Sequence, residues 1–276
     1  MSGPMNLSIK GYDVFANTGG RDLDPGGPVC LFVHGAGGDH SVWGLQTRYI
    51  AHHGAGVVAI DLPGHGRTGG EALTSIDALA DFLIAAIDAL ALQRPVLVGH
   101  SMGALACLEA ASRLGGRLAG LALCGVAAKM PVHPKLLDAA LNNRRAAAEM
   151  IASWGHGGPA HIGGNPAHGI SAVLTAVKLI ERTPPAVLHA DLAACDAYQG
   201  ALEAAAKVAC PTQFILGRLD KMTPAKAAQP LVDAIAGAHA TTLPASGHMM
   251  MAEAPNETRE ALMHLVRRLG AGERAA

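Results

Sequence analysis

The stretch PVLVGHSMG (residues 95–103), followed directly by the run ALACLEA, decides how this chain folds. An apolar segment rich in β-branched residues enters the stretch, a serine stands between two glycines, and an Ala/Leu-rich helical pattern leaves it. This order predicts a buried strand, a sharp turn and a helix, with Ser101 in the turn. Because Gly99 and Gly103 let strand and helix approach closely, we expect the Ser101 hydroxyl to be exposed at the strand end.

A serine in such a turn is a candidate nucleophile. The turn holds it in unfavourable backbone torsions, and the N-terminus of the following helix offers an unpaired N–H, here that of Met102, to an oxyanion. The same five-residue pattern also occurs by chance in ordinary glycine-rich turns. The rest of the chain must therefore supply a base and an acid before the serine can be given a chemical role.

Composition limits the class of protein and its partners. The 276 residues, half of them hydrophobic and 16% charged, are enough for one large α/β domain with an insertion or for two modest domains. The net charge is −1, and no cluster of Lys and Arg is evident, which argues against nucleic acid or an anionic membrane as a partner. No signal peptide and no membrane-spanning stretch is visible, so we expect a cytoplasmic location. The five scattered cysteines are expected to be buried free thiols.

Strand and helix patterns alternate along most of the chain. Residues 6–18 predict an antiparallel hairpin, and from residue 29 to residue 124 apolar strands alternate with helices, which predicts right-handed βαβ units and a mostly parallel sheet. One of these helices starts near Ile76, where Thr74 and Asp77 have the spacing of a capping box.

The alternation stops after residue 126 and resumes after residue 209. We therefore predict a core domain over residues 1–126 and 210–276, with a helical cap insertion over residues 127–209 lying on the active edge of the sheet. Within the insertion the helical patterns cover Leu136–Ile151, Ile170–Glu181 and Ala190–Lys207.

A second signal is the glycine-rich loop HGAGG (residues 34–38), which follows the buried run VCLFV. Glycines at the carboxyl end of a parallel strand let backbone N–H groups approach a ligand, so Ala36 N–H is the predicted second oxyanion donor. His34 is expected to brace the loop through hydrogen bonds. The glycine spacing does not fit a dinucleotide fingerprint, and no Gly-Lys-Ser/Thr follows to indicate phosphate binding.

The chain supplies a base and an acid after two later strands. A serine hydroxyl needs a base to take its proton, and an imidazole needs a carboxylate to fix its tautomer. Asp220 and His248 each follow a predicted buried strand by a few residues, which gives the chain order Ser, Asp, His. Asp61 also follows a strand, but the turn LPGHG after it favours a structural role, so Asp61 is only the reserve acid.

Five motifs in this order resemble the α/β-hydrolase superfamily over essentially the whole chain: HGAG (34–37), DLPGHG (61–66), GHSMG (99–103), GRLD (217–220) and GH (247–248). The resemblance implies the α/β-hydrolase fold, with a mostly parallel sheet between helices and a helical cap. It implies Ser101 as nucleophile, His248 as general base and acid, Asp220 as the orienting carboxylate, and Ala36 and Met102 as oxyanion donors. It implies no cofactor and no metal.

The insertion contains four histidines that invite a metal hypothesis, but their spacing does not match the i, i+4 pair of a zinc protease and no Cys pair accompanies them. We interpret them as loop histidines: His156, His161, His168 and His189.

A serine rather than an aspartate at the nucleophile position makes the chain similar to the esterase-like branch of the superfamily. We expect hydrolysis of a carboxylic ester, lactone or thioester of a small or medium aliphatic molecule through an acyl-serine. The predicted substrate contacts are Gly35, Trp154 and Met249.

Three alternatives stay open. A carbon–carbon bond hydrolase of the meta-cleavage product type needs basic or amide groups, for which the segment NNRR (142–145) is the candidate. The sequence does not separate an esterase from a cofactor-free perhydrolase. A ligand receptor that keeps the triad is the non-enzymatic alternative. The oligomeric state is not readable from the sequence.

Overall fold

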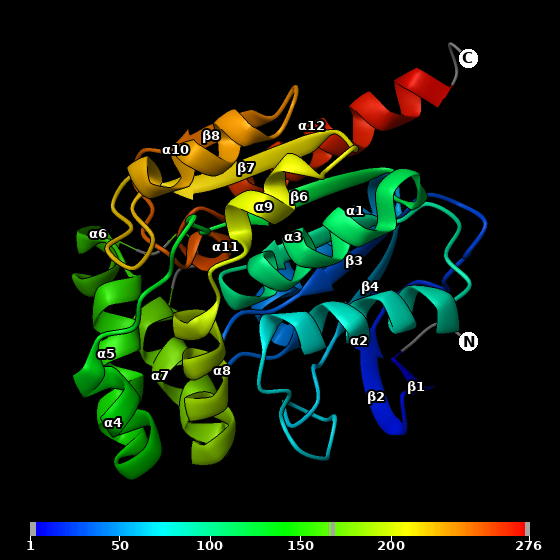
Figure 1. The fold of residues 1–276 in the computed structure, drawn as a ribbon. Coiled ribbons are helices and arrows are strands. Elements are labelled where there is room, and N and C mark those ends of the chain that lie inside the picture. The colour runs from blue at the N-terminus through cyan, green and yellow to red at the C-terminus, as the bar shows by residue number, and fades with distance from the viewer. Residues whose placement is uncertain (1–3, 165, 167–168, 274–276) are drawn as a thin grey trace.

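A computed structural model describes residues 4–164, 166 and 169–273. Its centre is an eight-stranded sheet with the spatial order β1-β2-β4-β3-β5-β6-β7-β8 (Figure 1). The two pairs that involve β2 are antiparallel and the other pairs are parallel, which confirms the predicted hairpin and the mostly parallel α/β fold. The strands are β1 Met5–Ile9, β2 Tyr12–Asn17, β3 Val29–Val33, β4 Gly56–Ile60, β5 Val96–His100, β6 Gly120–Cys124, β7 Thr212–Gly217 and β8 His239–Leu243.

The central strands are apolar throughout because both faces of the sheet are covered. Successive side chains of a strand point to opposite faces, so Leu31 and Val33 of β3 join one apolar cluster while Cys30 and Phe32 join the other. All four side chains are buried.

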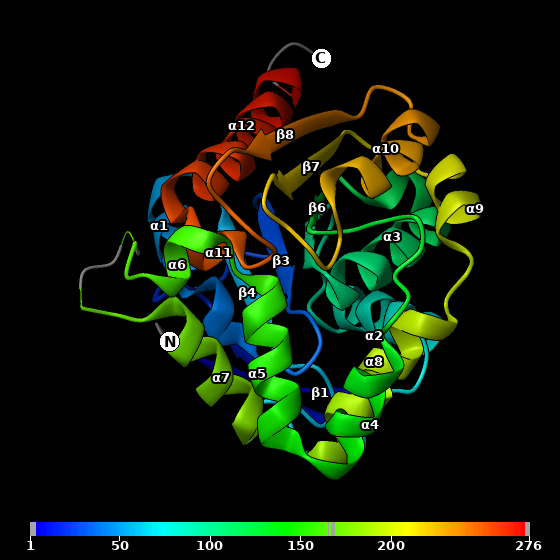
Figure 2. The same ribbon diagram turned by 90° about the vertical axis from the view of Figure 1, so that its left-hand side faces the viewer.

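Two sets of helices form these two layers, and Figure 2 shows α1 and α12 on one side of the sheet and α2 and α3 on the other. The first layer contains the 3-10 turn His40–Trp43, α1 Gly44–His53, α11 Met250–Glu253 and α12 Pro255–Glu273. The second contains α2 Ile76–Ala89, α3 Met102–Leu114, the 3-10 turn Gly115–Arg117, α9 Ala201–Ala206 and α10 Ala225–Ala234.

A third group of helices lies over the carboxyl ends of the parallel strands (Figures 1 and 2). We call this group the α4–α8 layer; all its helices except the short α6 contribute to an apolar cluster of their own, which includes Ala148, Ile180 and Leu188. They are α4 Pro134–Asn142, α5 Arg144–Gly155, α6 Gly158–His161, α7 Ala172–Arg182 and α8 Pro185–Ala197.

The helix boundaries correct three predictions. The predicted helix Leu136–Ile151 is two helices, because the Asn143 side chain accepts a hydrogen bond from Ala146 N and starts a new helix. The predicted helix Ala190–Lys207 comprises the end of α8 and the separate α9, and α9 packs against α3 of the core. Helix α2 is capped by Ser75, whose hydroxyl accepts from Ala78 N, and not by Thr74.

The five cysteines are free and buried, as predicted. Among the described residues, no helix is both long enough and apolar enough to cross a membrane.

Candidate active site

The turn between β5 and α3 has the predicted strained geometry. Ser101 has φ 54° and ψ −118°, a left-handed conformation that costs free energy in any residue with a Cβ. Two positions near Ser101 must be glycine, because a Cβ there would clash with the backbone. A Cβ on Gly99 would lie 2.3 Å from the Gly103 carbonyl oxygen, and a Cβ on Gly103 would lie 2.4 Å from the His34 carbonyl oxygen. The turn therefore packs directly against the HGAGG loop.

This packing predicts the result of one glycine substitution. We expect Gly103→Ala to lower the free energy of unfolding by about 3 kcal/mol or to leave the protein insoluble, since the contacted atoms are backbone. Gly116→Ala is the matched control, because a Cβ on Gly116 would meet nothing within 4 Å. The urea unfolding midpoints of the two variants test this prediction. Equal midpoints would contradict it, because they would show that the turn accommodates a Cβ at position 103.

Asp220 and His248 are in direct contact at the same edge of the sheet. The His248 Nδ1 to Asp220 Oδ2 distance is 2.8 Å, and both side chains are buried. Asp220 follows β7 and His248 follows β8, two parallel neighbours whose carboxyl ends lie at one edge. Strand β7 is buried as predicted, but the prediction is wrong for β8, which is the last strand of the sheet and buries only Leu243. With Nδ1 directed at the carboxylate, Nε2 is the nitrogen that remains to accept a proton from a hydroxyl.

The Asp220 carboxylate is held by three further donors. Met222 N and Thr223 N donate to Oδ1, and Thr223 Oγ1 donates to Oδ2, each at 2.8 Å. Burial raises the pKa of Asp220, but the nearby His248 and these hydrogen bonds outweigh burial, so the pKa lies below its ordinary value. Asp220 is therefore a fixed, ionised partner for the imidazole. The sequence interpretation did not single out Thr223, since no motif marks a threonine at this position as a partner of Asp220.

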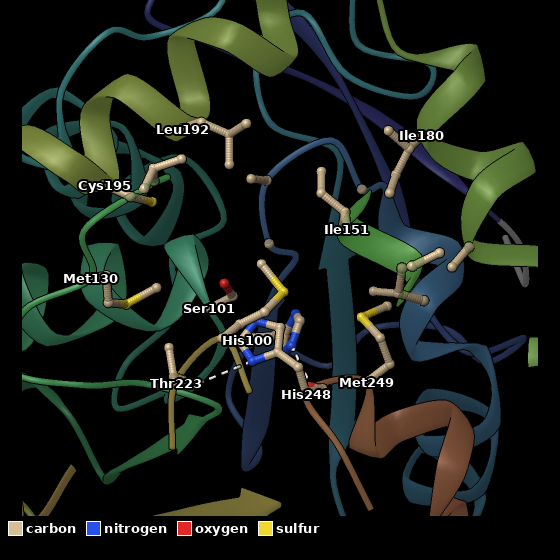
Figure 3. Close-up of a pocket in the computed structure, with 18 of the residues that line it drawn as sticks. His100, Ser101, Met130, Ile151, Ile180, Leu192, Cys195, Thr223, His248 and Met249 are labelled. Carbon is tan, nitrogen blue, oxygen red and sulfur yellow. Dashed lines mark hydrogen bonds between the residues drawn. The ribbon is translucent and has the colours of Figure 1, made fainter. Parts of the chain in front are cut away.

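Ser101 lies in the same cavity as His248, as Figure 3 shows. Contrary to the prediction of an exposed hydroxyl, Ser101 is buried, because the cavity lies beneath the α4–α8 layer. Within the described residues no hydrogen bond joins the Ser101 hydroxyl to the imidazole; in free hydrolases this contact is often long and tightens when substrate binds. The structure thus brings Ser101, His248 and Asp220 to one site, and directly connects the last two.

His100, which sequence reasoning passed over, supports the loop that carries His248. Its Nε2 lies 2.9 Å from the His248 carbonyl oxygen, and the two rings are 4.7 Å apart. Burial and then the adjacent His248 lower the pKa of His100 to about 3, so the ring is neutral and its Nε2–H donates. From the other side, His248 N and Met249 N both donate to the Gly155 carbonyl at the end of α5, at 2.7 and 3.1 Å.

The two predicted oxyanion donors flank Ser101. Met102 is the first residue of α3, so its N–H has no acceptor within the helix. Ala36 and Gly35 line the cavity on the side of β3, and a Cβ on Gly35 would lie 3.0 Å from Ser101 Cβ. His34 braces this loop as predicted: its Nδ1 contacts the Gly35 carbonyl at 2.9 Å, and its Nε2 accepts from Leu62 N at 3.1 Å.

The cavity above Ser101 is apolar. Among the described residues that line it, none is Lys, Arg, Asp, Glu, Asn or Gln. The α4–α8 layer supplies much of this lining, together with sulfur-containing side chains from several segments. The residues labelled around Ser101 in Figure 3 include Met130, Ile151, Ile180, Leu192, Cys195 and Met249.

Two of the three predicted substrate contacts line the cavity. Gly35 and Met249 belong to the lining, whereas Trp154 does not. The Trp154 ring lies 6.0 Å from the His133 ring and packs with the apolar cluster of the α4–α8 layer. The indole therefore stabilises helix packing rather than facing Ser101. The helical pattern gave no means of telling which apolar face of α5 meets the cavity.

The remaining candidates lie apart from this site. Asp61 accepts hydrogen bonds from His40 N, His40 Nδ1 and Arg67 N, so it joins loops rather than serving His248. Asp39, His40 and Asp61 place possible ligand atoms within 4.8 Å of one another. The bonds between His40 and Asp61, and the bond that Asp39 accepts from Ser41 N, give these atoms partners within the protein.

The predicted loop histidines differ in their surroundings. His156 is buried and lines the cavity, with Nδ1 contacting the Ala152 carbonyl at 2.8 Å. The loop prediction is wrong for two of them: His161 is the exposed last residue of α6, and His189 is half-buried within α8, because the helical turns continue through both positions. His168 lies outside the described residues.

The sequence was compared with those of known protein families and curated proteins, and the structure with solved structures. The sequence matches the alpha/beta hydrolase family over residues 30–261. It is also similar to the dihydrolipoyllysine-residue acetyltransferase component of the acetoin cleaving system of Pseudomonas putida. The two sequences are 36% identical over an aligned stretch of 116 residues, and this stretch covers 39% of this chain and 31% of that protein. The chain thus matches about a third of the length of that relative.

Solved structures resemble the whole chain. A thermophilic esterase superposes with a TM-score of 0.79 at 25% identity, covering 97% of this chain and 98% of that one. The enol-lactonase of Burkholderia xenovorans LB400 superposes with a TM-score of 0.85 at 21% identity, covering 95% and 100%. With the family match over residues 30–261, the chain belongs to the alpha/beta hydrolase family.

Proposed function

We propose that this protein is a serine hydrolase that cleaves carboxylic esters, lactones and thioesters included, whose acyl group is aliphatic and uncharged. The observation that carries the proposal is the contact between His248 and an ionised Asp220, next to Ser101, at the floor of a cavity without charged side chains. In this proposal the three residues form a catalytic triad. The α4–α8 layer acts as the cap that shapes the pocket for a small-molecule substrate.

The proposed reaction needs only groups of the chain, the substrate and water. His248 Nε2 takes the proton of the Ser101 hydroxyl as Oγ bonds to the carbonyl carbon. The carbonyl oxygen becomes an oxyanion that accepts hydrogen bonds from Ala36 N–H and Met102 N–H. The intermediate then expels the alcohol, which receives the proton from His248. Water attacks the acyl-serine by the same steps, releases the acid and restores Ser101.

The cavity lining supports an uncharged substrate. A carboxylate moved into an apolar pocket loses its hydration, and the described lining residues include no Lys or Arg to pair with it. Methionines such as Met130, Met222 and Met249 provide flexible, polarisable contacts that accommodate aliphatic chains of different shapes.

The NNRR segment gives no support to the carbon–carbon hydrolase alternative. Arg145 pairs with Glu149 and Glu181, Arg144 donates to the Thr183 carbonyl, and Asn143 caps α5. None of these residues lines the cavity. The anionic substrate of that reaction would therefore meet neither arginine of this segment in the pocket.

A matched pair of chromogenic esters tests the proposal. p-Nitrophenyl hexanoate and mono-p-nitrophenyl adipate have acyl chains of equal length, but the second ends in a carboxylate that is too distant from the ester to expel p-nitrophenolate readily by itself. We expect kcat/KM to be about 100-fold higher for the hexanoate, the cost of burying an unpaired charge. Comparable values for both esters would contradict the uncharged pocket. Absence of turnover across a series of acyl lengths would overturn the esterase proposal itself.

A further inference from the structure

The HGAGG loop, which carries the proposed oxyanion donor Ala36, is held by hydrogen bonds to side chains of the α4–α8 layer and of the residue that precedes α8 by two positions. Gly37 N donates to Asp191 Oδ2 of α8 at 2.8 Å, and the Gly37 carbonyl accepts from Thr183 Oγ1, next to α8, at 2.9 Å. The helix also comes close: a Cβ on Gly37 would lie 2.8 Å from a methyl group of Leu188. Both backbone groups of the residue after Ala36 are thus held by side chains from another part of the chain.

Asp191 also pairs with a second residue, His65. The same Oδ2 lies 2.8 Å from His65 Nε2, and both side chains are only 1% exposed. On the other side of the ring, His65 Nδ1 lies 3.0 Å from the Pro63 carbonyl oxygen. A carboxylate and a carbonyl oxygen only accept hydrogen bonds, so both ring nitrogens carry hydrogens and His65 is an imidazolium. The Asp191 carboxylate is therefore one half of a buried ion pair.

A buried ion pair of this kind is weak evidence of a contribution to stability. The cost of removing two charges from water offsets most of their attraction, and well-packed apolar residues often serve as well or better. The pair does fix the position of the Asp191 carboxylate, and that carboxylate holds Gly37 N. Its effect is thus directed at the loop beside Ser101.

We propose that Asp191 is a positioning residue for the oxyanion hole: fixed by His65, its carboxylate holds the Gly37 peptide and thereby aims the Ala36 N–H at the substrate oxygen. This inference rests on the proposed function. It makes helix α8 part of the site, because a shift of α8 away from the loop leaves the Gly37 N–H and carbonyl without these partners. The oxyanion hole is then fully formed only when the α4–α8 layer is packed against the HGAGG loop.

Four variants test the inference on an ester that the wild type hydrolyses. We expect Asp191→Asn to lower kcat about tenfold with little change in KM, since a displaced oxyanion donor costs transition-state stabilisation rather than binding. Thr183→Val has nearly the same shape but no hydroxyl, and kcat should fall several-fold. Thr183→Ser restores the hydroxyl and should restore kcat. Glu181→Gln, an acid-to-amide change on the surface of α7, is the matched control and should leave kcat unchanged.

The pH profile adds a readout that a purely structural role would not change. Burial lowers the pKa of His65, but Asp191 and the other acceptors outweigh burial and raise it above its ordinary value. The groups facing His65 are Asp191 of α8, the Pro63 carbonyl, the His34 ring and, farther away, Asp61. Support for the loop is complete below the raised pKa and is lost as pH rises through it. Wild-type kcat should therefore fall on the alkaline side, and this fall should be absent in Asp191→Asn.

The possible outcomes separate the two proposals. Ser101-dependent turnover by the wild type, combined with unchanged kcat in folded Asp191→Asn and Thr183→Val, would overturn the role of Asp191 and leave the esterase proposal standing. A rise in KM at constant kcat would do the same, since it indicates a binding role only. If Asp191→Asn does not fold, the Thr183→Val and Thr183→Ser pair decides, and equal kcat in these two counts against the inference. Absence of any wild-type turnover would overturn both proposals.

Discussion

Replacement of Ser101 by alanine is expected to lower kcat by about 10⁴-fold or more on every ester that the wild type hydrolyses. The reason is that Ser101 is the proposed nucleophile, and without its hydroxyl no acyl-enzyme forms. Water in the cavity can still meet His248 and the oxyanion donors, so a small residual rate is expected. Because Ser101→Ala removes a single oxygen atom and leaves a Cβ at the same φ of 54°, the melting temperature should change little.

A fluorophosphonate probe gives an independent measurement on the same variant. The probe bonds covalently to an activated serine oxygen, so wild-type protein should gain the mass of one phosphonyl group and Ser101→Ala should gain none. Ser112→Ala is the matched control, because Ser112 lies in the same helix and its hydroxyl donates to the Glu109 carbonyl. Labelling that persists in Ser101→Ala but disappears in Ser112→Ala would contradict the assignment of Ser101 and identify Ser112 as the labelled serine.

The parts of the fold that local sequence predicts are those governed by local forces. The central strands of the sheet, such as β3 and β5, are short apolar runs preceded by proline, and a run buried on both faces has few other interpretations. The turn at Ser101 is similarly determined, because Gly99 and Gly103 have no room for a Cβ. Asp220 and His248 follow parallel neighbours, so the sheet topology brings them together without any further signal.

Helix boundaries were less predictable, since two neighbouring residues can each serve as the N-cap of the same helix. Thr74 and Ser75 are both acceptable caps, and the hydrogen bond from Ala78 N selects Ser75. Asn143 fits a helix interior tolerably and a cap well, so the apolar pattern from Leu136 to Ile151 continued through a break. The pattern records which face is apolar and not where the backbone changes direction.

Long-range contacts of the α4–α8 layer could not be predicted. His65 and Asp191 are 126 positions apart, and the Gly155 carbonyl reaches the backbone of His248 from α5. Asp191 was visible in the sequence only as one acid within an Ala/Leu-rich helix, with nothing to show its burial. Trp154 shows the converse error, because a large apolar residue near the site packs between helices. Which helix face meets the cavity depends on the whole assembly.

Asp220→Asn is expected to lower kcat by about 10⁴-fold while the protein stays folded. The Asn side-chain oxygen can replace Oδ1 and accept from Met222 N and Thr223 N, so the local turn is retained. The amide nitrogen then occupies the position of Oδ2 and donates to His248 Nδ1. The imidazole is thereby fixed in the tautomer with its hydrogen on Nε2, which cannot accept the proton of Ser101.

Steady-state kinetics and thermal unfolding of three Asp→Asn variants check this expectation. Asp233→Asn is the matched control, since Asp233 lies on the surface of α10 and accepts from Gln229 Nε2. Asp61→Asn tests the reserve acid: it removes charge next to His40 and should lower stability more than kcat, because Asp61 holds loops together. The carboxylate that fixes the His248 tautomer is the one whose replacement lowers kcat most. Loss of kcat in Asp61→Asn, with full activity in Asp220→Asn, would therefore assign the orienting role to Asp61 instead of Asp220.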